Sequence, residues 1–266
     1  MNAPQVMIKV ELHSHTADDP LDRIPHSSRE LIDRAAALGY GALAVTLHDR
    51  QLETEPLVSY ASERGVVLIP GIERTVEGRH VLLLNFSHRA EGVRTFDDVR
   101  RLKASERGLV VAPHPFFPAG HSLRGCLSRH ADLFDAVEYN AMFTASLNFN
   151  LLAERWAKKH GKPMVGNGDV HRLVQLGTTY SLVDADPDPT AICDAIREGR
   201  VSVVKRPISW TMATRIVLEL TFWGAGPGPR AALPDAVAPR DPDESRVRRG
   251  ARDAARRGRE PVKAAR

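Results

Sequence analysis

The sequence predicts an α/β fold, namely a single-domain distorted (β/α)7 barrel followed by a disordered C-terminal tail. Short apolar runs alternate with amphipathic stretches of helical spacing roughly seven times before residue 223, a pattern typical of parallel βα units. No linker-like composition interrupts the alternation, and a chain of 266 residues can form one barrel around one core. We therefore expect one domain over residues 1–226. Seven repeats suit a barrel better than an open sheet, although periodicity alone does not decide between them.

Short apolar runs are the predicted strands. The first, Val6 to Val10, leads directly into the pair His13 and His15, and most later runs also end in polar residues. The predicted strands cover residues 6–10, 42–46, 66–69, 81–84, 109–112, 136–137, 164–165, 179–183 and 201–204.

Amphipathic spacing predicts six helices between these strands. The first has the spacing of a capping box, with Ser27 three residues before Glu30, and Gly39 ends it. In the last helix an apolar stripe is expected to pack on the barrel, and it consists of Trp210, Ala213, Ile216, Val217 and Leu220. The predicted helices cover residues 27–38, 55–64, 95–107, 148–160, 188–198 and 209–222.

Bulk composition excludes several classes of protein. With 42% hydrophobic and 26% charged residues the chain is an ordinary globular one. No apolar run approaches the roughly 18 residues that cross a bilayer, and the N-terminus lacks a signal-peptide pattern, so a cytoplasmic protein without a membrane partner is expected. Cys126 and Cys193 are isolated in the sequence, which predicts neither a disulfide nor a thiolate metal site.

The positive net charge belongs to the end of the chain. Residues 227–266 hold eleven Lys or Arg and six Asp or Glu, which gives this segment a net charge of +5. Because the whole chain carries +4, residues 1–226 carry −1. This segment is rich in proline and poor in large apolar residues, which predicts disorder. A basic arm can bind nucleic acid, but interspersed acids and the lack of aromatics favour a solvated extension without a specific partner.

Metal-capable side chains recur just after predicted strands. In a parallel βα barrel these strand ends share one rim, which is where active sites form. A lone histidine at such a place is more often a surface residue, but repetition at strand after strand, mixed with carboxylates, favours a metal site. Because there are too many candidates for one ion, the pattern favours several ions. The residues concerned are His13, His15, His48, Glu73, His114, Asp169 and His171.

These residues resemble the ordered motifs of the PHP (polymerase and histidinol phosphatase) family of metal-dependent phosphoesterases. The resemblance covers residues 6–205. Its motifs are His13-Ser14-His15-Thr16, Thr46-Leu47-His48-Asp49, Gly71-Ile72-Glu73, His80, Pro113-His114-Pro115 and Gly168-Asp169-Val170-His171. The resemblance implies a distorted seven-stranded barrel that holds two or three divalent ions, Zn²⁺, Mn²⁺ or Fe²⁺.

The resemblance also implies a ligand set for each ion, listed here by ion. The first is held by His13, His15, Glu73 and Asp169; the second by Glu73, His80 and His114; the third by Asp19, His48 and His171. Asp18 is the alternative to Asp19, because the loop length does not determine which acid is used. The side of the barrel that His80 reaches does not follow from the sequence pattern.

Other polar residues near these motifs are expected to orient ligands rather than bind metal. They are Glu11, Asp49, Glu138 and Asn140. Many family members have aspartate at the positions of Glu11 and Leu47. These differences are expected to affect how the ligands are oriented, but not whether the metal site is present.

Several basic residues are candidates to contact substrate phosphate, although each alone is more often a surface ion-pair partner. They are Arg50, Arg74, His121, Arg124 and Arg172. His26, His88, His130 and His160 are expected to be surface residues.

The function predicted from the resemblance is hydrolysis of a phosphate ester at a multinuclear metal site. A small phosphorylated metabolite or a nucleotide is favoured as substrate, because the body of the chain is near neutral and has few aromatic residues. Two alternatives are an exonuclease or phosphodiesterase that acts on oligonucleotides, and a non-catalytic PHP module stabilised by metal. The second is less favoured because all nine ligand positions carry a metal-capable side chain.

Overall fold

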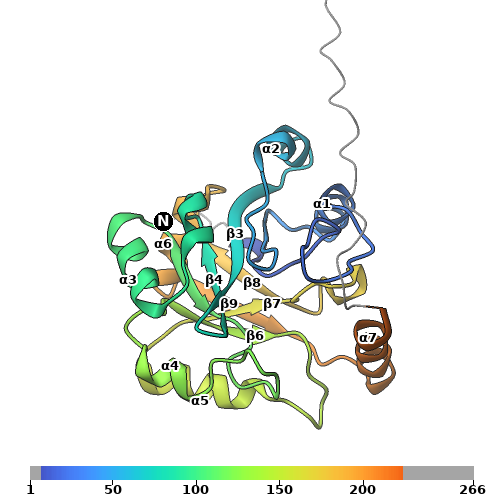
Figure 1. Ribbon diagram of the computed structural model, residues 1–266. Helices are drawn as coiled ribbons and strands as arrows, with labels where there is room; N and C mark the ends of the chain where they lie inside the picture. The colour runs from blue at the N-terminus through green and yellow to red at the C-terminus, as the bar shows by residue number, and fades with distance from the viewer. Residues whose placement is uncertain (1–6, 224–266) are drawn as a thin grey trace, which may run out of the picture. The chain divides into compact units, whose positions relative to one another are not determined.

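A sheet of nine strands forms the centre of the molecule in the computed structural model, which describes residues 7–223 (Figure 1). Along the sheet the strands follow the order β7-β6-β5-β4-β3-β2-β1-β8-β9. Their bounds are β1 Met7–Glu11, β2 Ala42–Val45, β3 Val67–Val76, β4 Arg79–Leu84, β5 Leu109–Ala112, β6 Ala136–Asn140, β7 Met164–Asn167, β8 Thr179–Asp184 and β9 Val201–Lys205. The predicted tail, residues 227–266, lies outside the described residues.

Seven α-helices of the described part of the chain flank this sheet, six of them at or within a few residues of the predicted positions. Capping boxes begin two of them, at Ser27 with Glu30 and at Thr95 with Asp98. The bounds are α1 Ser28–Ala37, α2 Glu55–Ser62, α3 Phe96–Ser105, α4 Gly125–Arg129, α5 Asn150–His160, α6 Pro189–Arg197 and α7 Trp210–Trp223. The short helix α4 was not predicted.

The barrel class is confirmed, but the uniformly parallel pairing expected from the sequence is wrong. β1, β2 and β3 are parallel, as are β5, β6 and β7, whereas β4 runs antiparallel to both of its neighbours, and β8 to both of its neighbours. β3 continues past Ile69 to Val76 and turns directly into β4 through Glu77 and Gly78, whose φ angles are 48° and 74°. Two successive positive φ angles are what a type I′ hairpin turn requires.

Close backbone approach at Gly166 nearly closes the barrel. The Gly166 N–H donates to Oγ of Ser181 at 2.8 Å, and the Ser181 hydroxyl donates to the Gly166 carbonyl at 3.1 Å. A Cβ at Gly166 would lie 2.8 Å from the carbonyl oxygen of Tyr180 and 2.7 Å from Val203. Only glycine therefore lets β7 approach β8 and β9 this closely.

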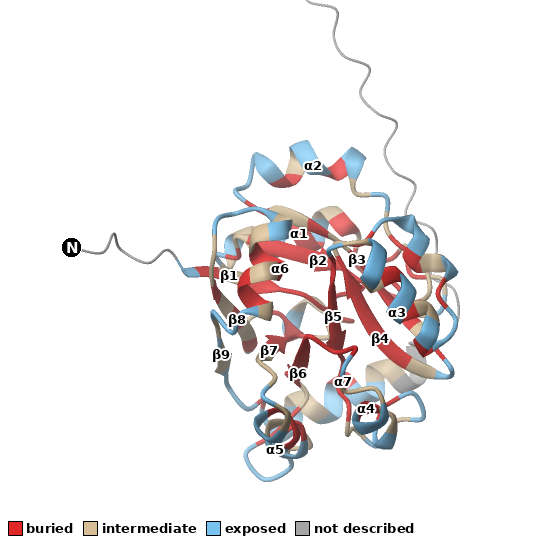
Figure 2. Cartoon of the chain, turned by 90° about the vertical axis from the view of Figure 1, so that its left-hand side faces the viewer, coloured by how far each residue is buried: buried red, intermediate tan, exposed pale blue. Residues whose placement is uncertain are grey.

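Alternate residues of the strands pack into separate layers. Val81 and Leu83 belong to the layer beneath α3, α4 and α5, whereas Leu82 and Leu84 belong to the layer that includes α6. Both sets are buried, which explains why the strands are continuous apolar runs (Figure 2). α6 also buries Cys193 in that layer, where burial raises the pKa of the thiol to about 12.

Helix α7 departs from the expected packing. Ile216 is buried, but Trp210 is 57% exposed and Val217 51% exposed, so the predicted core stripe is wrong for these two residues. No helix among the described residues is long and apolar enough to cross a membrane.

Candidate metal centre

The strand ends deliver the predicted ligands to one rim of the barrel. Each of the parallel strands β1, β2, β5 and β7 ends two to four residues before one or two of them. All nine predicted residues lie at this rim, and all are buried except the half-buried Asp169. They are His13, His15, Asp19, His48, Glu73, His80, His114, Asp169 and His171.

The hairpin explains how His80 joins them. Because β4 runs antiparallel to β3, the start of β4 lies beside the later part of β3, where Thr75 pairs with His80. Nδ1 of His80 then lies 2.7 Å from Oε1 of Glu73. A residue at the start of its strand thus reaches the same rim as residues that follow theirs.

Glu73 is the geometric centre of the cluster. Its side chain is 1% exposed, and five histidine ring nitrogens lie within 3.3 Å of its two oxygens. Nε2 of His13, His15 and His48 lie 3.2, 3.3 and 3.2 Å from Oε2, and Nδ1 of His80 and Nε2 of His114 lie 2.7 and 3.2 Å from Oε1. Each oxygen can therefore face a different cation.

Carboxylates behind the histidines orient the rings. Nδ1 of His13 lies 2.8 Å from Glu138, and Nδ1 of both His15 and His48 lies 3.0 Å from the same oxygen of Asp19. A carboxylate accepts, so these rings carry the proton on Nδ1 and turn Nε2 toward Glu73.

Among the described residues four buried histidine ring nitrogens have no hydrogen-bond partner, and three of them belong to candidate ligands: Nε2 of His13, Nε2 of His15 and Nδ1 of His114. The two Nε2 atoms lie 3.4 and 3.6 Å from Oδ1 of Asp169. A buried polar atom without a partner costs free energy, which a shared cation between these nitrogens and carboxylates would remove. The donor set therefore fits divalent metal ions that favour nitrogen and oxygen.

Within residues 7–223, four groups of three residues offer ligand atoms within 4.8 Å of one another. They are His13 with His15 and Asp169, His13 with Glu73 and His114, His48 with Glu73 and His80, and His15 with His48 and His171. Eight of the nine predicted ligands belong to these groups, and Asp19 is the exception. Because these groups share residues, they suit several adjacent ions better than a single ion.

Charges in the cluster reinforce one another. Burial opposes ionisation of Glu73, but the nearby imidazoles of His80, His13 and His48 outweigh burial and hold its pKa well below the usual value. Burial likewise opposes protonation of His13, yet Asp169, Glu138 and Glu73 together hold its pKa well above the usual value. The field at this rim therefore favours cations strongly, and a metal ion can take the place of the imidazole protons.

Two of the candidate ligands have unusual backbone angles. His114 and Asp169 have φ angles of 27° and 48°, in the left-handed region that ordinary side chains rarely adopt. The His114 N–H donates to Glu138 at 2.7 Å, and this hydrogen bond stabilises the backbone conformation of His114. Backbone strain of this kind concentrates at functional sites, where it aims side chains that a regular strand would point elsewhere.

Comparisons with known proteins bear on the fold that carries this centre. A family model described as PHP-associated matches residues 148–201, from the start of α5 to β9. The matched segment is PHP-associated, and the fold of the chain is of the PHP type. No curated protein sequence matches it. Among solved structures, a two-domain protein from Bacteroides vulgatus that contains a PHP-like metal-dependent phosphoesterase aligns with a TM-score of 0.59 at 17% identity, over 82% of this chain and 72% of that one.

Two further structures have the same fold as this chain. PsfC from Pseudomonas syringae aligns with a TM-score of 0.56 at 19% identity, over 81% of this chain and 97% of that one. The lesion-specific endonuclease EndoQ from Pyrococcus furiosus aligns with a TM-score of 0.50 at 13% identity, over 83% of this chain and 68% of that one. At these identities the likeness shows the fold alone.

The loop after β1 places two acids in the candidate metal centre, and only one of them was predicted. Asp19 contacts His15 and His48, whereas Asp18 turns away toward Thr16 and Ser28. Asp22 was not predicted, yet its carboxylate lies 3.1 Å from Nε2 of His171 and 4.0 Å from Nδ1 of His48. A short acidic loop after two histidines was the available signal.

The residues expected to orient ligands lie in different places. Glu11 is fully buried and accepts from the N–H groups of His13 and Gly168, and burial raises its pKa to about 8. Asn140 donates to Asp169 at 3.1 Å and to Glu138 at 3.3 Å. Asp49 instead accepts hydrogen bonds from the Thr75 N–H and from Arg74. These two contacts join the loop after β2 to β3, and neither of them involves a candidate ligand.

The arginines expected near substrate are largely engaged within the protein. Arg74 is buried and donates to Asp49 and to the carbonyl of Val93. Arg50 donates to the carbonyl of Asp18 at 2.6 Å. Arg172 lies 3.0 Å from Glu219 of α7 and donates to its neighbouring carbonyl, that of His171, at 2.8 Å. These contacts give all three a structural role.

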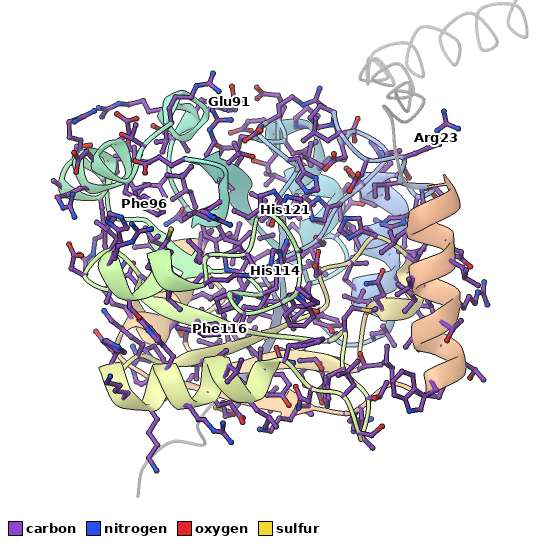
Figure 3. All side chains as sticks on the ribbon, turned by 60° about the horizontal axis from the view of Figure 1, so that its bottom comes forward. Arg23, Glu91, Phe96, His114, Phe116 and His121 are labelled. Atoms are coloured by element: carbon purple, nitrogen blue, oxygen red, sulfur yellow. The ribbon has the colours of Figure 1, made fainter. Side chains whose placement is uncertain are left out.

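The loop between β5 and α4 reaches the metal rim. The exposed ring of His121 stacks on that of His80 with 4.2 Å between centroids, and Figure 3 shows His114 and His121 close together in the middle of this view. Arg124 is exposed, with a φ of 47°, just before α4. Of these two predicted substrate residues, His121 thus contacts a candidate ligand.

His26 is not the surface residue that the sequence predicts. It is 3% exposed, and Nε2 lies 2.9 Å from the carbonyl oxygen of His15, to which it donates. Burial lowers the pKa of His26 to about 4. Its neutral ring therefore braces the backbone of the His13 to His15 segment from behind, because the loop of residues 17–26 folds back over β1.

Proposed function

We propose that this PHP domain is a phosphoesterase that depends on two or three divalent ions, Zn²⁺, Mn²⁺ or Fe²⁺. The observation that supports this most is the burial of Glu73 among five histidine ring nitrogens, two of which, on His13 and His15, lack a hydrogen-bond partner. Purely structural packing would leave these atoms unsatisfied at a cost of roughly 1–3 kcal/mol each.

Adjacent residue groups would hold the ions. We assign one ion to His13, His15 and Asp169, a second to His80 and His114, with Glu73 shared between them. A third would lie between His48 and His171, with Asp19 or Asp22 beside it. When bound, paired ions activate water for attack and stabilise the oxygens of the transferred phosphoryl group.

The chain's own carboxylates prepare this site. Glu138 and Asp19 keep Nδ1 of the histidines protonated, so that Nε2 is free to bind metal. Asn140 donates to Asp169 and so keeps its second oxygen turned toward His13 and His15. These contacts position the ligands before any ion binds, which lowers the cost of reorganisation.

We propose a small phosphorylated metabolite or a nucleotide as substrate. The arginines nearest the rim form contacts with Asp49, Asp18 and Glu219. They are therefore not free to bind the several phosphates of a polyanionic substrate. We also place the whole site within residues 1–226, so that removal of 227–266 should leave metal content and activity unchanged.

Metal analysis combined with a substrate series tests the proposal. Purified protein should carry at least two ions per chain and hydrolyse p-nitrophenyl phosphate, with less activity on bis-p-nitrophenyl phosphate and oligonucleotides. His13→Ala and Glu73→Ala should lose metal and turnover, whereas His88→Ala should not, because His88 is exposed and its ion pairs are with Glu53 and Glu91 rather than with candidate ligands. Fewer than two ions with no hydrolysis would favour a non-catalytic module, and a preference for oligonucleotides would favour a nuclease.

A further inference from the structure

An apolar pocket of about 430 Å³ lies beside the metal centre, between α7 and the loops that follow β5 and β6. Its lining includes three aromatic rings that come from separate segments, namely Phe117, Phe149 and Trp210. Trp210 and Leu218, which line this pocket, are 57% and 49% exposed to solvent. Large apolar side chains grouped at a surface in this way mark a binding site. The size is that of a site for a small organic molecule.

The pocket shares a wall with the metal centre. Asn140 and Asp169 line it, and the same Asp169 lies 3.4 Å from His13 and 3.6 Å from His15. On the other side, the ring of Phe117 is 6.2 Å from that of His114 and 5.5 Å from that of Phe149. A ligand that touches the metal-binding residues can therefore extend directly into the apolar space.

Helix α7 is held in place as the outer wall. Arg172, which follows His171, lies 3.0 Å from Glu219 of α7. At the other end, Nε1 of Trp210 donates to Oγ of Ser146 at 3.2 Å, in the loop that forms the opposite wall. Contacts at both ends of the helix make the pocket a feature of the fold, and Figure 3 shows α7 along one margin of the face that carries His114.

We propose that this pocket binds the organic group of the substrate, and that this group is apolar and aromatic. The proposal rests on the phosphoesterase function proposed above and narrows its substrate to phosphate esters of an aromatic alcohol or phenol. Among the described residues that line the pocket none is lysine or arginine, so it offers nothing to neutralise further phosphates. Apolar side chains and stacked rings instead suit a flat hydrocarbon surface.

Paired ligands that cannot be hydrolysed separate the pocket from the chemistry. Calorimetry on the metal-loaded full chain would compare naphthylmethylphosphonate with methylphosphonate, which share the phosphonate but differ in the aromatic group. We expect the aromatic ligand to bind at least about tenfold more tightly, in line with burial of a ring in an apolar pocket. Equal affinities in the wild-type protein would overturn the proposal.

Two leucines provide a matched pair of variants. Leu218 on α7 lines the pocket, whereas Leu152 on α5 is equally exposed, at 47%, and does not. Leu218→Asp should reduce the preference for the aromatic phosphonate to about threefold or less, and Trp210→Ala should act in the same direction. Leu152→Asp should keep the wild-type preference. If both aspartate variants act alike, the pocket is not the binding site.

Hydrolysis and solution mass complete the test. Wild-type protein should prefer naphthyl phosphate to phenyl phosphate, and Leu218→Asp should not. If no ester is hydrolysed but the phosphonate preference persists, the phosphoesterase function fails and the pocket assignment stands. If the wild-type chain is a dimer that Leu218→Asp dissociates without changing the phosphonate preference, the face is a subunit interface and the proposal is wrong.

Discussion

Oε1 of Glu138 lies 2.8 Å from Nδ1 of His13, and both side chains are completely buried. The other oxygen of Glu138 accepts from the His114 N–H at 2.7 Å. The carboxylate of Glu138, on β6, therefore orients the ring of His13 and holds the strained backbone of His114. This arrangement makes Glu138 a positioning residue for two candidate ligands that are about a hundred residues apart in the sequence.

Glu138→Gln should weaken metal binding without unfolding the protein. The amide can accept only with its oxygen, so its NH₂ group must face a donor at either His13 or His114. We expect metal affinity to fall about 10–100-fold, as is typical when the partner of a ligating histidine is lost. Competition with a chromophoric chelator measures this, with Glu63→Gln, at an exposed carboxylate, as the control. Unchanged affinity would remove Glu138 from the support of the site.

Stability near His26 should depend on pH. Its pKa is about 4 in the folded protein and roughly 6.5 when unfolded, because burial disfavours the charged ring. As pH falls from 6.5 toward 4 the unfolded chain binds the proton first, so up to about 3 kcal/mol of stability is lost. His26→Asn, which still carries a donor, lacks this dependence.

The measurement is the difference between the two unfolding free energies at each pH. Wild-type protein should lose its advantage over His26→Asn progressively below pH 6.5. Parallel curves for the two proteins between pH 7 and pH 4.5 would contradict the assignment of a neutral, buried ring.

Gly166→Ala should destabilise the barrel closure. The added methyl would lie 2.8 Å from the Tyr180 carbonyl oxygen, and backbone cannot move as a side chain can. We expect a loss of about 1–3 kcal/mol in the free energy of unfolding. Gly125→Ala is the matched control, because nothing lies within 4 Å of the Cβ position there, and chemical denaturation compares the two. Equal stability of both variants would show that β7 does not depend on this approach.

Arg172 should act through Glu219 rather than on phosphate. Arg172→Ala and Glu219→Ala would both release α7, so each should weaken naphthylmethylphosphonate binding about threefold, and the double variant should be no worse than either. Methylphosphonate binding should not change in either variant. A loss of methylphosphonate affinity confined to Arg172→Ala would instead show direct contact with the phosphonate.

Much of the architecture is predictable because strand ends carry a local signal. Apolar runs followed at once by His13, His48 or His114 locate both a strand and its rim, and capping residues locate the helices. Pairing direction is different, because it depends on partners distant in sequence. The turn at Glu77 and Gly78 was the available signal for the antiparallel hairpin, and it also determines where His80 lies.

Residues in the loop after β1 were the hardest to assign. Asp18, Asp19 and Asp22 share one chemistry, and which of them faces the histidines depends on how residues 17–26 fold back. The same fold-back buries His26, whose sequence neighbours are polar. The apolar stripe of α7 is equally ambiguous, because a helix face that lines a pocket has the same periodicity as one that packs in a core.

The β3–β4 hairpin also bears on the order in which the centre assembles. Glu73 and His80 are seven residues apart, so the loop that joins them closes at little entropic cost, whereas His13 and His171 are separated by most of the barrel. Local opening that separates β1 from β7 leaves Glu73, His80 and His114 on strands that remain paired through β4. A half-assembled centre can thus retain these three candidate ligands, which would make metal a ligand of partly folded chains as well as of the finished barrel.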